Sequence, residues 1–210
     1  MSFFEYIAQK PWIGAILVAL VLLTIFVWVK AIASSKKRDE ERKRIIAELE
    51  KEKALRNEFK TVSEDTFLPD KDDYRLIVGM CANVQMSIEK AEDINTAFGA
   101  LSETEKNAYC FGYVFEDSQK SLSNFFRSNG EPLLSSAKNA VDEIIGGKFA
   151  ELFAQEFVML DENDETTSVD EKILEETDSA FEQLMEKEKD SVYKAVAEYI
   201  RNRKSEFLEK

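Results

Sequence analysis

The pattern of hydrophobic and polar residues divides the chain into an apolar run, a charged stretch and a periodic region. From Pro11 to Val29 there is no charge, and the residues that follow are dominated by Lys, Arg, Asp and Glu. Beyond Pro69, apolar residues recur at steps of three and four, the period of a helix with one buried face. The pattern therefore predicts an all-α protein: an N-terminal tail and transmembrane anchor over 1–33, a charged helical spacer over 34–60, a linker over 61–73, and a compact multi-helix, bundle-like domain over 74–210.

The uncharged run has the composition of a single membrane-spanning helix. Twelve of its nineteen residues are Ile, Leu, Val or Phe, which favours insertion by roughly 5 kcal/mol. Trp12 and Trp28 bracket the run, and a helical rise of 1.5 Å per residue places them about 24 Å apart. We expect these two side chains to be membrane-interface anchors, one at each surface of the bilayer.

A cleaved signal peptide is the alternative interpretation, because Ala31-Ile32-Ala33 before Ser34 resembles a cleavage site. The apolar part of a signal peptide is about 7–15 residues long, however, and follows a basic segment. Here the basic residues come after the run: Lys30, Lys36, Lys37, Arg38, Arg42, Lys43 and Arg44. The positive-inside rule then predicts a single-pass protein of the cell (inner or plasma) membrane with its C-terminal domain in the cytoplasm.

The spacer carries opposite charges at helical spacing, as in Asp39 with Lys43 and Glu52 with Arg56. Its few apolar residues do not keep a heptad repeat for long. A solvated helix is therefore favoured, and a coiled-coil homodimer is the alternative.

Within the domain, apolar stripes and capping residues mark successive helices. Ser102 and Glu105 form a predicted capping box, and Ser168 with Glu171 a second one. Gly146-Gly147 closes the most clearly amphipathic segment. One stripe is expected to run from Ile77 to Phe98, and the amphipathic segment contributes Leu133, Leu134, Ala137, Ala140, Val141, Ile144 and Ile145 to the core.

Charge is distributed unevenly. The chain has a net charge of −13, but residues 61–210 carry 33 acidic and 16 basic residues, a net of −17. A domain of this charge repels nucleic acid and attracts basic surfaces. We therefore expect a basic protein as partner and no direct binding of nucleic acid.

The residue types required by common catalytic and metal sites are scarce. The chain has no histidine, which removes the usual general base and the common zinc sites. Cys81 and Cys110 stand in apolar surroundings typical of core packing. The acidic segment that begins at Asp161 has Thr166 and Lys172 where a calcium-binding loop needs Gly and Glu. We therefore predict no catalytic residue, no metal and no cofactor, and an enzyme of unknown type is the alternative.

About half of the chain, 101–202, resembles the DNA-mimic protein domain family. The resemblance rests on "LSETEK", "SLSNFFRSNG", "AVDEIIGGKFAELF" and the closing "AFEQLMEKEKDSVYKAVAEYIRN". The family commonly has Asn-Gly-Gly-Phe before an aromatic pair. This chain keeps the pair as Phe125-Phe126 but has Gln-Lys-Ser-Leu at 119–122. The resemblance implies a small acidic helical domain, and one member of the family imitates duplex DNA to occupy a transcription regulator.

These observations predict a membrane-anchored, acidic, non-catalytic interaction module that sequesters a basic or nucleic-acid-binding protein at the cytoplasmic face. The alternative is a non-catalytic accessory or structural subunit of a membrane assembly. The predicted partner-binding residues are the acidic ones of the loop and the following helix: Asp161, Glu162, Asp164, Glu165, Glu175, Glu176 and Asp178.

Overall fold

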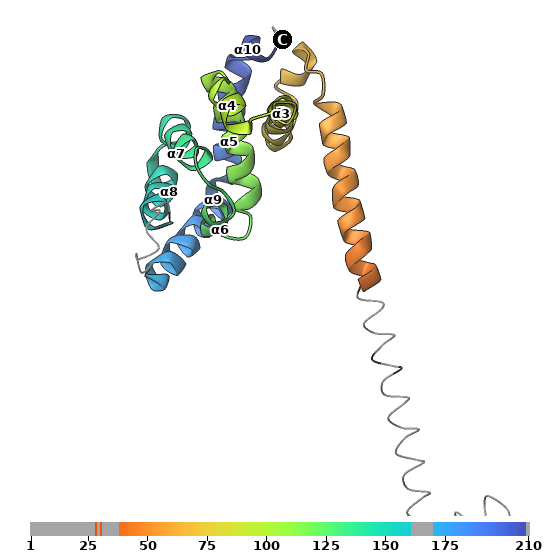
Figure 1. Cartoon of the computed structure of the whole chain (residues 1–210). Helices are drawn as coiled ribbons and strands as arrows, with labels where there is room; N and C mark the ends of the chain where they lie inside the picture. Colours follow the sequence, from red (N-terminus) through yellow and green to blue (C-terminus); the bar gives the residue numbers. More distant parts are fainter. Residues whose placement is uncertain (1–27, 29, 31–37, 161–169, 209–210) are drawn as a thin grey trace, which may run out of the picture. The chain divides into compact units, whose positions relative to one another are not determined.

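The computed structural model describes residues 28, 30, 38–160 and 170–208, and every regular element within them is helical (Figure 1). Contacts divide the chain into two compact units, Met1–Lys53 and Ala54–Lys210. The second unit is a multi-helix, bundle-like domain. The predicted all-α fold class is therefore confirmed.

The described part of the first unit is a solvated helical segment. Residues 38–53 are helical, and all of them are exposed. Arg44 and Glu48 pair one turn apart at 3.8 Å. No helix among the described residues has the length and apolar character needed to cross a membrane. The predicted span from Pro11 to Val29, with Trp12, lies outside them except for Trp28, which is exposed.

The second unit begins at Ala54 with the last residues of this helix, which ends at residue 58, and it continues through short and long helices. Their bounds are η1 Glu64–Phe67, α3 Asp73–Ile88, α4 Ile94–Gly99, α5 Glu103–Asp117, α6 Leu122–Ser128, α7 Leu133–Ile144, α8 Gly147–Leu160, α9 Glu171–Asn202 and α10 Ser205–Leu208.

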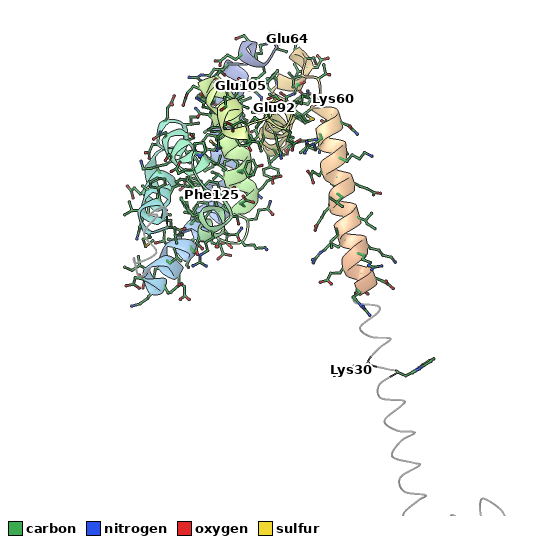
Figure 2. The ribbon with its side chains drawn as sticks, viewed as in Figure 1. Lys30, Lys60, Glu64, Glu92, Glu105 and Phe125 are labelled. Carbon is green, nitrogen blue, oxygen red and sulfur yellow. The ribbon has the colours of Figure 1, made fainter. Side chains whose placement is uncertain are left out.

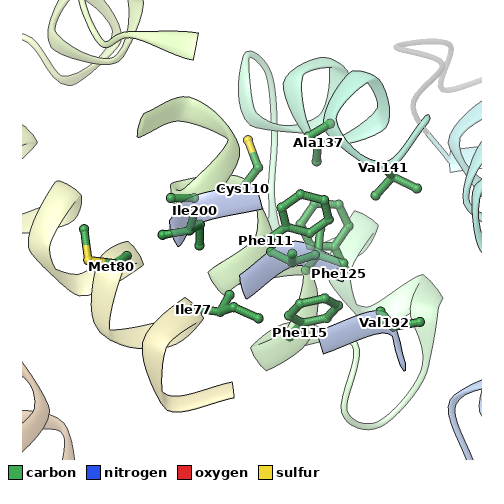
Figure 3. Packing of buried hydrophobic residues seen from close by; sticks show 14 of the residues in the cluster. Ile77, Met80, Cys110, Phe111, Phe115, Phe125, Ala137, Val141, Val192 and Ile200 are labelled. Carbon is green, nitrogen blue, oxygen red and sulfur yellow. The ribbon is translucent and has the colours of Figure 1, made fainter. Parts of the chain in front are cut away.

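Helices α5 and α9 form the centre of the domain. Helix α3 packs against both of them. On another side, α7 packs mainly against α5, and α8 packs against α9 and α7 (Figure 1). Helix α6 contacts α5, α8 and α9. The core between these helices is rich in phenylalanine. Phe111, Phe125 and Phe153 are completely buried, and Figure 3 shows Phe111 and Phe125 among the packed side chains. Phe125 packs against Phe153 with the rings tilted by 44° and their centroids 5.6 Å apart.

Helices α3 and α5 approach closely where Gly112 faces Cys81. A Cβ atom at Gly112 would lie only 2.2 Å from the Cβ of Cys81, so no side chain fits there. The Sγ of Cys81 donates a hydrogen bond to the carbonyl oxygen of Tyr109 at 3.4 Å. Cys81 and Cys110 are both buried free thiols, which confirms the prediction that they are core residues.

The domain begins earlier in the chain than the predicted boundary at residue 74. Phe59, at the end of the predicted spacer, is 4% exposed and lies flat over Gly79 of α3. The Nδ2 of Asn83 donates to the carbonyl of Phe59 at 2.7 Å, and Arg56 pairs with Glu89. Phe67, in the predicted linker, is also buried. Apolar spacing alone did not indicate this packing, because single aromatic residues in a charged segment carry no periodic signal.

The helix ends agree with the predicted signals in part. The capping box is confirmed: Ser102 Oγ accepts from Glu105 N–H at 3.3 Å, and Glu105 Oε2 accepts from Ser102 N–H at 3.0 Å. Gly146 and Gly147 follow the end of α7 with positive φ angles of 65° and 56°, which glycine tolerates best. The stripe from Ile77 to Phe98, in contrast, is not one helix.

Helix α3 ends at Ile88, and α4 starts anew at Ile94 behind Asp93. The Asp93 carboxylate accepts from Asn95 N–H at 2.9 Å, so this side chain caps the new helix. Ile94 is therefore exposed rather than buried. Helix α9 is capped by Asp170, which accepts from Lys172 N–H at 3.0 Å. The second predicted capping box is therefore wrong: Glu171 is the first residue of α9, directly after Asp170, and Ser168 lies outside the described residues.

Replacing Gly112 with Ala should destabilise the domain by about 1–3 kcal/mol, because the added methyl group must push α3 and α5 apart. The control is Gly99→Ala at the end of α4, where a Cβ would meet nothing within 4 Å. That change should be neutral or stabilising. Urea unfolding of both variants measures the difference, and equal effects would contradict the close packing at Gly112.

Replacing Phe59 with Ala should cost about 3–5 kcal/mol, because it removes a buried ring from the surface of α3. The matched control is Leu49→Ala, since Leu49 is 58% exposed in the first unit. Thermal unfolding should show a clear loss for the first variant and no change for the second. A chain that tolerates both equally would restore the boundary near residue 74.

Candidate functional site

The predicted partner-binding residues fall into three structural groups. Asp161, Glu162, Asp164 and Glu165 lie outside the described residues. Glu175 and Glu176 are exposed on the first turns of α9, as expected for a contact surface. Asp178 is only partly exposed and is occupied by contacts inside the domain.

Asp178 holds the beginning of α6. Its two carboxylate oxygens accept from the backbone N–H of Ser123 at 2.9 Å and from the Ser123 hydroxyl at 2.7 Å. A negative charge at a helix N-terminus is favourable because it satisfies free N–H groups. Asp178 is therefore a structural contact between α9 and α6, and its position in the acidic stretch gave no sign of this role.

Four glutamates form an exposed acidic face on α9. Glu171, Glu175, Glu182 and Glu186 are separated by four, seven and four residues, so they line one side of the helix. Between Glu171 and Glu186 the sequence has a single basic residue, Lys172, and this lysine pairs with Glu176 at 3.7 Å. Figure 2 shows side chains along the length of α9. We call these four glutamates the α9 acidic face.

Glu156 of α8 is a carboxyl group inside the core. It is completely buried, and burial raises its pKa to about 9, with the Asp178 carboxylate adding to the effect and Arg127 opposing it. The group is consequently neutral at pH 7. It follows the buried Phe153 by three positions in "FAQEFVML", and that position on an apolar face was the only sequence signal for its burial.

A groove runs beside the middle of α9, and aromatic rings form its wall. Tyr74 of α3 and Tyr193 of α9 lie 5.1 Å apart between centroids, and Tyr193 meets Phe115 of α5 edge-on at 4.8 Å. The Nε2 of Gln119 donates to the Tyr74 hydroxyl at 3.2 Å. The Nζ of Lys189 stands 5.5 Å from the centroid of the Tyr193 ring.

Two adjoining cavities make up this groove. The larger, about 650 Å³, is bordered by Asp72, Tyr74, Asp190 and Tyr193. The smaller, about 260 Å³, shares Gln119, Lys189 and Tyr193 with it and adds an apolar floor of Phe115, Phe181 and Met185. Glu182 and Glu186 of the α9 acidic face border the smaller cavity. We call the two cavities together the Tyr74–Tyr193 groove.

Carboxylates from three helices or helix ends surround the two tyrosines. Burial is the main cause that raises the pKa of Tyr193 to about 12, and Tyr74, Asp190 and Asp72 contribute to the same rise. The pKa of Tyr74 is raised first by burial and then by Glu116, while Gln119 lowers it. The carboxylates that raise these two pKa values come from the start of α3 (Asp72), the end of α5 (Glu116) and the middle of α9 (Asp190).

The described residues offer little for covalent or metal chemistry. Burial raises the pKa of the Cys110 thiol to about 12 and that of Cys81 well above its usual value, so both stay protonated. In the described ranges, no three acidic or cysteine side chains converge on a point that could hold a metal ion. What the arrangement can do is attract and seat positive charge.

Sequence reasoning did not identify the Tyr74–Tyr193 groove. Its walls come from α3, the turn after α5 and the middle of α9, which are far apart in the sequence. No spacing rule connects such residues.

Comparison with known proteins gives no match: no family model fits the chain, and no curated protein or solved structure is similar to it. The resemblance of 101–202 to the DNA-mimic family accordingly stays a prediction from the sequence.

Glu156 should make stability depend on pH. Between pH 4.5, its usual pKa, and pH 9 the folded state keeps a proton that the unfolded state has lost. Stability should therefore fall as pH rises through this window, by about 1.4 kcal/mol per pH unit for one proton. Glu156→Gln should remove this decline and melt higher than the parent at pH 8, whereas Glu151→Gln, an exposed change on the same helix, should not. Melting curves from pH 5 to 9 that overlay for the parent and both variants would contradict a buried neutral carboxyl.

Proposed function

We propose that the chain is a membrane-tethered, non-catalytic acidic module that holds a basic protein at the cytoplasmic face of the cell membrane. The α9 acidic face is the observation that carries this proposal. Its glutamates are exposed along one side of a helix, and a single lysine accompanies them over sixteen residues, 171–186.

The charge of the face is available to a partner because internal contacts use little of it. Lys172 pairs with Glu176, which lies beside the face, and Arg127 approaches Glu171 at 3.8 Å. Both are exposed pairs, and such pairs contribute little to stability. Among the residues that the structure describes, no ion pair engages Glu175, Glu182 or Glu186, so these side chains can meet an incoming lysine or arginine without breaking the fold.

The density of this charge indicates how strongly a DNA-binding partner would be held. Four carboxylates over the 15 residue steps of the face correspond to about one charge per 6 Å. Duplex DNA carries one charge per about 1.7 Å. A DNA-binding protein would therefore find a weaker field here than on DNA, and binding would rely on charges from the rest of the domain as well. We infer a partner that is basic, with a nucleic-acid-binding protein as the case that the family resemblance suggests.

The tether is supported by the sequence. The run from Pro11 to Val29 is uncharged and is followed by seven basic residues within the next fifteen, 30–44. With the basic end inside, a single span would hold the domain in the cytoplasm. The domain's charge of −17 over 61–210 would keep it away from anionic headgroups.

A second candidate function is supported by apolar side chains on the first unit. Ile45, Ile46 and Leu49 are 49%, 55% and 58% exposed on the helical residues 38–53. Such residues suit contact with another helix, as in a homodimer or an accessory subunit of a membrane assembly. In that case the acidity of the domain serves solubility alone.

The full-length chain in detergent should capture a basic protein from its source cells at low salt and release it at high salt. Changing Glu175, Glu182 and Glu186 to Gln should reduce capture about tenfold or more, since several charges act together. The matched control changes three exposed acidic residues on other segments, Asp70→Asn, Glu92→Gln and Glu143→Gln. Quantitative mass spectrometry measures the retained protein, and duplex DNA should compete if that protein binds DNA.

The proposal would be contradicted by a partner whose capture changes neither with salt concentration nor when Glu175, Glu182 and Glu186 are replaced by Gln. If that partner is instead lost when Ile45 and Leu49 become Ser, the accessory-subunit function takes its place.

A further inference from the structure

The Tyr74–Tyr193 groove combines the two features that recognise an organic cation. Aromatic rings attract positive charge through their faces, and here two tyrosines lie side by side with Phe115 behind them. Asp72 and Asp190 stand at the same cavity. A carboxylate close to an aromatic face favours a guanidinium or ammonium group. The carboxylate pairs with the positive charge, and the ring face attracts the same cation.

Lys189 of the chain itself already occupies a cation position in this groove. Its Nζ lies 5.5 Å from the Tyr193 ring, within the range of a cation–π contact. The side chain is exposed and sits four residues before Tyr193 on the same helix. An exposed lysine held by one such contact is displaced at little cost, since these contacts are weak when solvated.

The groove is also continuous with the α9 acidic face. Glu182 and Glu186 belong to that face and border the smaller cavity, whose floor is Phe115, Phe181 and Met185. A basic segment lying along α9 would therefore reach the groove within the length of the same helix. A lysine or arginine stem would cover the apolar floor while its charged end reached the tyrosines.

We propose that the Tyr74–Tyr193 groove is the seat for one arginine or lysine side chain of a basic protein segment that lies along the α9 acidic face. This inference rests on the proposed function and adds a defined anchor to it. The face supplies long-range attraction, and the groove supplies the position at which one side chain is held. Binding should therefore favour a segment that carries a cation at that position, because a complementary charge at a defined point fixes the register.

The test compares two lysines on one helix. The full-length chain is titrated with a fluorescein-labelled peptide of alternating arginine and serine, and fluorescence anisotropy reports the Kd. Lys189→Met removes the positive charge that lies in the groove. Lys187→Met makes the same change of charge at a position that borders neither cavity. Lys189→Met should bind the peptide about two- to fivefold more tightly than Lys187→Met.

A second pair of variants tests the attractive side. Asp190→Asn removes a carboxylate of the groove, and Glu188→Gln removes one that borders neither cavity. Asp190→Asn should weaken binding about threefold more than Glu188→Gln, and the difference should vanish for a peptide in which citrulline replaces arginine. All four positions are exposed, so the variants should fold like the parent.

The outcomes separate this inference from the function on which it rests. If the parent binds the arginine peptide in a salt-dependent way but each variant equals its control, the groove is not the seat and the acidic module stands. If the parent shows no salt-dependent binding of the peptide, both fail.

Discussion

The close approach of α3 to α5 at Gly112 is the constraint on which the rest of the domain depends. With hydrogen as its side chain, Gly112 lets the Cβ of Cys81 enter the space where its own Cβ would be. Helix α3 can then pack on α5 and on α9 at once. Tyr74, at the start of α3, is thereby brought to Tyr193 and Phe115. A wider separation of α3 and α5 would open the core, and it would also separate the residues that form the Tyr74–Tyr193 groove.

The acidic residues of the chain serve different purposes although they share one chemistry. Asp93, Asp170 and Asp178 satisfy N–H groups at helix starts. Glu156 is buried and neutral, and because its pKa is raised, the domain loses stability as pH rises toward 9. The α9 acidic face remains for solvent or a partner. Net charge alone could not separate these roles, because burial and hydrogen bonding decide what each carboxyl group does.

Local signals in the sequence predicted a large part of the helical organisation. The capping box at Ser102 and the glycine pair after α7 are where they were expected, and the thiols are buried. The errors arose where periodicity was extended too far. The stripe through Ile94 crosses the break between α3 and α4. On α7, Val141 is fully buried, and Ile144 is partly buried and packs against the core as predicted. A period of three and four describes a face but does not say which of its residues a neighbouring helix covers.

By itself, the sequence determined the all-α class, many helix ends, the excess of negative charge and the exposure of Glu175 and Glu176. These properties depend on short-range hydrogen bonds, on residue spacing within a few turns and on composition, all of which can be read along a single segment. Only the tertiary structure decided that Phe59 belongs to the core, that Asp178 is a structural contact and that Tyr74 meets Tyr193. Each of these depends on contacts between residues far apart in the chain, and such contacts exist only once the helices have packed.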